Sequence, residues 1–214
     1  MADLKNRRPL KSRDTGWAQA ISGRLAAANI TPNQISAASV VFAAFAGACF
    51  AGVDRSAPGL DIALLLAGAG FVQMRLLCNL FDGMVAVEAG RGDATGPFWN
   101  EVPDRLADML ILVGFGVGAG VTSAGWAAAC LAVLISYLRA FGASLDQVSD
   151  FSGPMAKQHR MAAVTIAAIL AASLAMWLDP TSILQLALWI VILGEILTAF
   201  RRMRRIYLRM KQTG

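Results

Sequence analysis

Acidic and amide side chains gather in one part of an otherwise apolar chain. One set follows helical spacing (i, i+3, i+4, i+7) and would share one helix face: Asn79, Asp82, Gly83 and Ala86. A second set stands four residues apart: Gly96, Asn100, Asp104 and Asp108. It would share one face too if that helix continues through Pro103. Carboxylate and amide oxygens are ligands that Mg²⁺ or Mn²⁺ accepts, with phosphate oxygens completing the shell. The two sets therefore indicate a site for a hard cation and a phosphate-bearing ligand.

The sequence that must position these residues is that of a membrane protein. Of its 214 residues, 57% are hydrophobic and only 15% are charged, whereas a soluble domain is about a quarter charged. A bilayer crossing needs roughly 20 mostly apolar residues. The sequence predicts an all-α integral membrane fold with an N-terminal cytoplasmic amphipathic helix over 17–28 and six transmembrane helices. The six spans are 35–53, 62–81, 103–121, 124–145, 161–178 and 181–200.

The basic residues predict the orientation of these spans. They concentrate at both termini and in the loops of one side, whereas only Arg55 lies on the other side. Both termini are therefore expected in the cytoplasm, in a multi-pass protein of the inner (plasma) membrane. We expect one domain, with an interfacial segment (1–33), a six-helix bundle (34–203) and a basic tail (204–214). The net charge of +5 belongs to these flanks, so no nucleic acid partner is expected.

The segment from Asn79 to Asp104 resembles the signature of the CDP-alcohol phosphatidyltransferase family. The family's pattern is D-x-x-D-G-x-x-A-R, eight residues, then G-x-x-x-D-x-x-x-D, and every interval matches here. The segment 30–33 (Ile-Thr-Pro-Asn), before the first span, is also similar to an entry motif of the family. Three positions depart from the pattern. Asn79 and Asn100 replace aspartates, and Val87 replaces the arginine.

The resemblance implies a role for each matched residue. Asp104, the last signature position, would act as the general base. The first three positions would bind metal, and because two of them are uncharged asparagines, a neighbouring acid could compensate. The expected metal ligands are Asn79, Asp82 and Asn100, with Glu101 or Asp108. Nucleotide contacts are expected from Asp82, Gly83, Ala86 and Gly96, and phosphate or acceptor contacts from Arg139, Lys157 and Arg160.

The activity that the resemblance implies is transfer of a substituted phosphoryl group, phosphatidyl in the first instance, from a CDP-linked donor to an alcohol. CMP would be released, and the reaction would belong to phospholipid synthesis with Mg²⁺ or Mn²⁺ as cofactor. A site at the cytoplasmic boundary suits CDP-diacylglycerol, whose acyl chains lie in membrane lipid and whose nucleotide lies in water. Another CDP-linked donor stays open, and the sequence does not identify the polar alcohol.

Several features allow other interpretations. A catalytically silent relative that binds lipid or nucleotide would explain the two asparagines, and a small transporter would explain charges within the membrane. The transporter is less favoured because we find no repeat and the charges gather at one face. Arg75 either reaches the interface or belongs to the site, and Glu195 is expected to pair with a basic neighbour. Interleaved G-x-x-x-G spacings over 114–120 predict close helix packing, within the subunit or in a homodimer.

Overall fold

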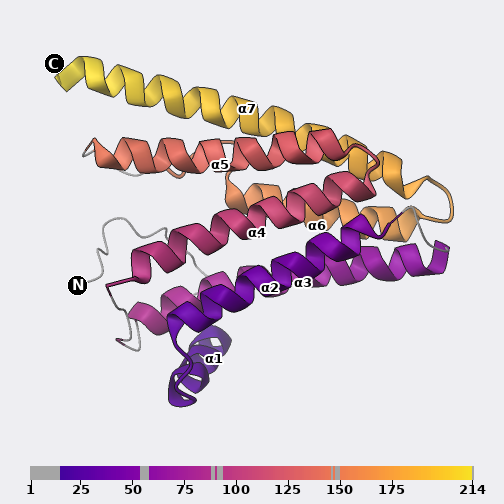
Figure 1. Cartoon of the computed structure of the whole chain (residues 1–214), viewed down its shortest axis with the longest axis horizontal. Coiled ribbons are helices and arrows are strands. Elements are labelled where there is room, and N and C mark those ends of the chain that lie inside the picture. The colour runs from indigo at the N-terminus through magenta and orange to yellow at the C-terminus, as the bar shows by residue number, and fades with distance from the viewer. Residues whose placement is uncertain are drawn as a thin grey trace.

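A computed structural model of the chain describes residues 15–53, 58–87, 90, 94–145, 147 and 150–213. These residues form α-helices and contain no strand (Figure 1), which confirms the all-α class. The helices are α1 (Gly16–Ala27), α2 (Pro32–Ala51), α3 (Pro58–Val87), α4 (Gly96–Gly118), α5 (Thr122–Ser144), α6 (Lys157–Leu174) and α7 (Pro180–Thr213).

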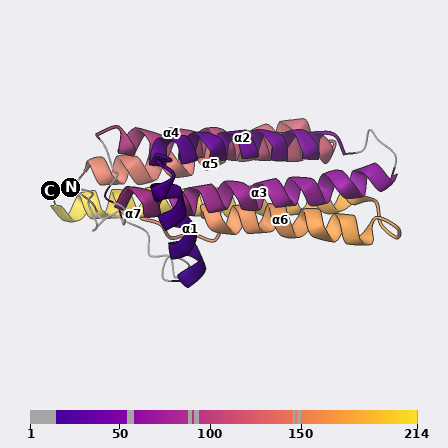
Figure 2. The ribbon, with the colours of Figure 1, turned by 90° about the horizontal axis from the view of Figure 1, so that it is seen from below.

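Helices α2 to α7 close into a ring. Going around it, α2 packs against α4, α4 against α5, α5 against α7, α7 against α6, α6 against α3, and α3 against α2. Figure 2 shows the ring as two layers, with α2, α4 and α5 in one and α3, α6 and α7 in the other. Helix α1 lies across the end of α3, where Trp17 contacts Phe81 edge-on at 6.1 Å between ring centroids. The ring brings residues far apart in the sequence to one end of the bundle.

Four of these helices are long and apolar enough to cross a membrane: α2, α3, α5 and α7. Their outward faces carry large hydrophobic side chains, such as Leu186, Leu193 and Phe200 on α7, each 60–65% exposed. Exposed apolar surface of this extent suits lipid and not water. The chain is therefore a helical membrane protein. Helices α4 and α6 complete the ring, but α6 begins with charged residues and α4 carries them from Glu101 on. Whether all six helices cross the bilayer stays a prediction, as does an amphipathic α1.

The helix boundaries follow from local sequence signals. The Thr31 hydroxyl accepts the backbone N–H of Gln34, whose side chain accepts the backbone N–H of Thr31, so a complete capping box begins α2. Helix α4 continues through Pro103, and the second polar set therefore shares one face. The predicted break at Thr122 falls where α5 begins. Helix α7 continues to Thr213, because arginines and leucines propagate a helix as well outside a membrane as inside it.

Glycines bring α4 into direct contact with two neighbouring helices. A Cβ on Gly114 would overlap the backbone of Gly47 on α2, and a Cβ on Gly116 would lie 2.5 Å from the Cα of Gly125 on α5. Neither position has room for a side chain. The glycine spacing of the third span thus serves packing within the subunit.

Candidate active site

The two polar sets meet between α3 and α4. The Asn79 side-chain amide donates to Oδ1 of Asp104 at 2.7 Å, which joins the first and last positions of the signature. Asp82, buried one turn further along α3, accepts the Ser36 hydroxyl of α2 at 2.8 Å. Helices α2, α3 and α4 therefore hold these side chains in one place.

Asp104 lies between two cationic groups. Its Oδ2 pairs with the Lys157 ammonium at the start of α6, and its Oδ1 lies 3.3 Å from Nη2 of Arg75. Burial lowers the pKa of Lys157 to about 8, and Arg75 acts in the same direction, while Asp104 opposes both. The Lys157 side chain is still 25% exposed. Asp104 is thus a carboxylate held in position by its neighbours, beside a lysine that solvent can reach.

A chain of buried ion pairs continues from this point through the ring. Asp108 accepts Nη2 of Arg75 at 2.7 Å and also pairs with Arg160 on α6. Arg160 in turn donates to Glu195 on α7 at 2.9 Å. Arg75, with no exposed surface, does not reach the interface, and Glu195 has the basic partner expected of it. We refer to Arg75, Asp104, Asp108, Lys157, Arg160 and Glu195 as the charge cluster.

The other predicted site residues lie at the outer side of this cluster. Asn100 is exposed in the first turns of α4. The Glu101 carboxylate is 39% exposed and pairs with both Arg105 and Arg139. Gly83, Ala86 and Gly96 are partly exposed on the ends of α3 and α4 that carry the signature. Metal ligation by Glu101 and Asp108 stays a prediction. It is disfavoured because arginines already pair with both carboxylates.

The oxygen donors beside Asp104 suit a cation, although few of them are carboxylates. Within the described ranges, no three acidic, histidine or cysteine side chains gather as a ready metal site. Asp82 and Asp104 nevertheless supply carboxylate oxygens, and Oδ1 of Asn79 is buried with no hydrogen-bond partner. These are donors of the kind that Mg²⁺ and Mn²⁺ take. The residues fit a single ion whose shell is completed by phosphate oxygens of a ligand.

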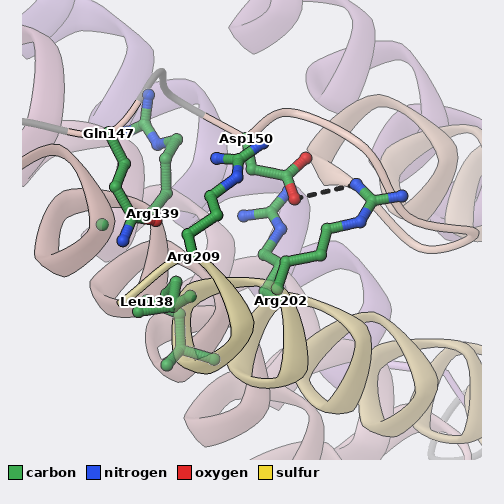
Figure 3. Close-up of a pocket in the computed structure, with 9 residues that line it drawn as sticks. Leu138, Arg139, Gln147, Asp150, Arg202 and Arg209 are labelled. Carbon is green, nitrogen blue, oxygen red and sulfur yellow. Dashed lines mark hydrogen bonds and ion pairs between the residues drawn. The ribbon is translucent and has the colours of Figure 1, made fainter. Parts of the chain in front are cut away.

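Sequence reasoning missed a second basic site next to this one. Helix α7 continues past the predicted boundary at 203/204, so Arg205 and Arg209 of the predicted basic tail share a helix face with Arg202 and approach Arg139 of α5 (Figure 3). Their spacing, i, i+3 and i+7, was the available signal. The cavity holds only about 10 Å³, room for about one water. It is lined by Leu138, Arg139, Gly142, Gln147, Asp150, Arg202, Arg205, Ile206 and Arg209.

Asp150 ties this basic pocket to the loop before α6. Its carboxylate accepts Arg205 at 2.9 Å and the Ser152 hydroxyl at 2.6 Å, and these bonds hold the pKa of Asp150 below its usual range even though partial burial raises it. Arg202 is anchored by the carbonyl oxygens of Ile135 and Ser152. The whole is an apolar helical ring in which opposite charges converge at one end, as in a helical membrane protein with a polar site.

Known proteins place the chain within that class. It is 31% identical over 149 residues to the bifunctional IPC transferase and DIPP synthase of Rubrobacter xylanophilus, a match that covers 67% of this chain and 32% of that protein. It is 29% identical over 143 residues to the phosphatidylinositol phosphate synthase of Streptomyces avermitilis, covering 63% of this chain and 59% of the relative. The chain thus spans between a third and three fifths of these curated relatives. No family model matches it.

Solved structures share the fold. The Mycobacterium tuberculosis phosphatidylinositol phosphate synthase PgsA1, in complex with manganese and citrate, superposes with a TM-score of 0.74 at 18% identity, over 89% of this chain and 88% of that one. The same protein with CDP-DAG bound gives 0.73 at 18% identity, over 89% and 93%. The shared fold and the names of the two curated relatives agree with the resemblance of the signature to the CDP-alcohol phosphatidyltransferase family.

Proposed function

We propose that this protein transfers a substituted phosphoryl group from a CDP-linked donor to an alcohol and releases CMP, in phospholipid synthesis. The observation that carries the proposal is the contact between Asn79 and Asp104, which assembles the two halves of the signature around an ion-paired carboxylate. Both curated relatives are named as transferases or synthases of this chemistry, and a solved relative holds CDP-DAG. CDP-diacylglycerol is therefore the donor that we propose first.

Asp104 is the proposed general base. It would take the proton of the acceptor hydroxyl as the hydroxyl oxygen attacks the phosphorus that bears the lipid. The bond between that phosphorus and the bridging oxygen of the diphosphate breaks, and CMP leaves with the electron pair. Lys157 pairs with Asp104, and its partial exposure allows it to turn toward a phosphate as the alcohol approaches.

Asp82 and the carbonyl oxygens of Asn79 and Asn100 are the residues that would hold Mg²⁺ or Mn²⁺ beside Asp104. Such an ion, when bound, neutralises diphosphate charge and stabilises the departing CMP. The manganese in the solved relative supports this part of the proposal. Gly83, Ala86 and Gly96 would let the nucleotide approach the backbone, because none of them has a side chain beyond Cβ.

The basic pocket supports an acceptor alcohol that itself carries a negative charge. Arg139 lines it and Lys157 is accessible nearby, whereas Arg160 is 1% exposed and bound to two carboxylates. Arg160 would therefore position the phosphate-binding groups and not contact the acceptor. The name of one relative, a phosphatidylinositol phosphate synthase, agrees with a phosphorylated alcohol. The pocket would open by movement of its arginine side chains.

The membrane arrangement belongs to the same proposal. Four helices qualify as spans by length and composition, and the ring packing of α4 and α6 supports six crossings of one domain. The arginines of α7 and the signature lie at the same end of the ring, which supports a cytoplasmic site and cytoplasmic termini in the inner membrane. A homodimer stays open, with the outward apolar faces as the surfaces for it.

The test is CMP release by the purified full-length chain with CDP-diacylglycerol, Mg²⁺ or Mn²⁺, and a panel of polar alcohols with and without phosphate. Metal-dependent release by the wild type but not by Asp104→Asn supports the proposal and identifies the acceptor. Release by both forms alike contradicts the assignment of the base.

A silent relative that binds lipid or nucleotide is the second candidate. It is favoured by one observation: the two carboxylates Asp104 and Asp108 are paired with three cations of the protein itself. In this case the folded protein would bind CDP but release no CMP with any acceptor. A CDP titration alongside the release assay separates the two candidates.

A further inference from the structure

Arg75 is the member of the charge cluster that the proposed reaction leaves unexplained. It stands one helical turn before Asn79 on α3, and its side chain is fully buried. Its Nη2 reaches Oδ1 of Asp104 at 3.3 Å and Oδ1 of Asp108 at 2.7 Å. A positive charge built into the protein therefore lies beside the acid that the metal would share.

Neutralising Asp108 does not account for this arginine. Asp108 already pairs with Arg160, and Arg75 uses only Nη2, while its Nε and Nη1 are buried without an acceptor. Burying a guanidinium with two unused nitrogens is costly, because the desolvation of those donors is not compensated. The neighbouring Oδ1 of Asn79 is unpaired as well. Unsatisfied donors and an unsatisfied acceptor at one place point to a ligand that supplies the missing partners.

The signature of this chain also carries less negative charge than the family pattern. Asparagines at positions 79 and 100 remove two negative charges that would attract a divalent ion, and Arg75 adds a positive one that repels it. Lys157 adds a second positive charge at the same carboxylate. Arg75 and Lys157 face three acids, Asp82, Asp104 and Asp108, so an anion such as a diphosphate would be held by the unpaired guanidinium nitrogens of Arg75 and not by a net positive charge.

We propose that Arg75 is a resident cation that takes over the charge-neutralising role of a divalent metal in donor capture, so that this protein binds the diphosphate of CDP without metal. Divalent metal is then needed for turnover alone. The inference rests on the donor class of the proposed function. Arg75 would contact the ligand directly, since its unpaired Nε and Nη1 would donate to the diphosphate.

The experiment is a calorimetric titration of CDP into the full-length protein in lipid nanodiscs, with Mn²⁺ or with EDTA. We expect the Kd of the wild type to differ by less than about threefold between the two conditions, whereas a metal-bridged diphosphate would lose about tenfold or more. Arg75→Lys keeps the charge but not the Nε and Nη1 donors, so it should recover only part of the CDP binding that Arg75→Gln loses. Arg75→Gln should weaken CDP binding in EDTA about tenfold, with Mn²⁺ restoring most of the loss.

Binding of Mn²⁺ in the absence of nucleotide is a second measurement. Because Arg75 repels the ion, Arg75→Gln should bind Mn²⁺ about tenfold more tightly than the wild type in an electron paramagnetic resonance titration. Arg204→Gln, at an exposed position of α7, is the matched control for loss of one arginine and should change neither binding event.

Outcomes that overturn the inference are distinct from those that overturn the function. Wild-type binding of CDP that weakens tenfold or more in EDTA (a criterion of about 1.4 kcal/mol) overturns the role of Arg75 and leaves the transferase proposal intact. Absence of CDP binding in both conditions overturns the two together. The wild-type arm needs no variant, so the test stands even if Arg75→Gln does not fold.

Discussion

The two halves of α4 are held in the bundle by opposite kinds of contact. Its first half carries Asp104 and Asp108, which pair with cations from α3 and α6. Its second half carries Gly114 and Gly116, which touch the backbones of α2 and α5. Ion pairs attach the first half to its neighbouring helices, whereas direct backbone contacts at glycines attach the second half.

The difference separates stability from chemistry along a single helix. The glycine contacts cannot rearrange or be replaced by contacts with a ligand, because the neighbouring atoms belong to the backbone. The charge cluster contains buried atoms without partners and a partly exposed lysine, Lys157, so its contacts can be exchanged for those of a ligand. We expect changes in the second half of α4 to affect folding, and those at Asp104 to affect turnover.

The largest effect is expected for Asp104→Asn. Loss of a general base lowers turnover by about 10²–10⁴-fold, whereas the freed Lys157 can be hydrated where it stands, since a quarter of it is exposed. CMP release and thermal unfolding should be measured on the same preparation. Asp82→Asn should also abolish turnover without unfolding. Full activity in both variants would show that the signature is not the site.

Asp108→Ala should have the largest effect on stability within the charge cluster. It removes the carboxylate shared by Arg75 and Arg160, and an uncompensated buried charge costs about 3–5 kcal/mol. Glu195→Gln is the matched comparison, because a glutamine oxygen can still accept from Arg160, and it should be milder. Chemical denaturation in detergent measures both. Equal losses would mean that the cluster does not hold α4.

Gly114→Ala tests the other half of the helix. The added Cβ would meet the backbone of Gly47, and overpacking of this kind costs about 1–3 kcal/mol. Gly70→Ala on α3 adds the same methyl group where nothing lies within 4 Å, and there the lower backbone entropy of the unfolded state should raise stability by about 0.5–1 kcal/mol. Opposite signs in the unfolding midpoint support close packing. The same sign for both would contradict it.

The sequence predicted what local signals control. The capping box at Thr31 depends on residues that are neighbours in the sequence, and the gap predicted between the spans 103–121 and 124–145 falls close to the turn at 119–121 that separates α4 from α5. Helix periodicity predicted which residues share a face within each of the two sets, and the resemblance to the family predicted that the two sets form one site, where Asn79 and Asp104 now meet. Hydropathy gave the apolar parts of the helices but not their polar ends, so α4 begins before the predicted span and α7 ends after it.

The ion pairs could not be predicted in the same way. The acid that pairs with Arg75 or Arg160 is set by how far each helix is displaced along the bundle axis relative to its neighbours. Helix periodicity gives no information about that displacement. Arg75 was therefore open between an interfacial and a site position, and the assignment of Glu101 as a compensating ligand did not foresee its pairing with Arg139. Contacts within a helix can be read from spacing, whereas contacts between helices require the packing itself.

The smallest expected effect lies outside both halves of α4, at the start of α7. Asp179 accepts the Thr181 hydroxyl and the backbone N–H groups of Thr181 and Ser182, the two backbone bonds at 3.1 and 3.2 Å, and these bonds lower the pKa of Asp179. Asp179→Ala should cost about 1 kcal/mol, the usual value of an N-cap. Because the folded pKa is the lower one, this contribution is present above the unfolded pKa and is lost as pH falls through the folded pKa. The difference in unfolding midpoint between variant and wild type should therefore shrink in acid, with Asp179→Asn intermediate. A difference independent of pH would show that the carboxylate charge contributes nothing and that the cap acts through its geometry alone.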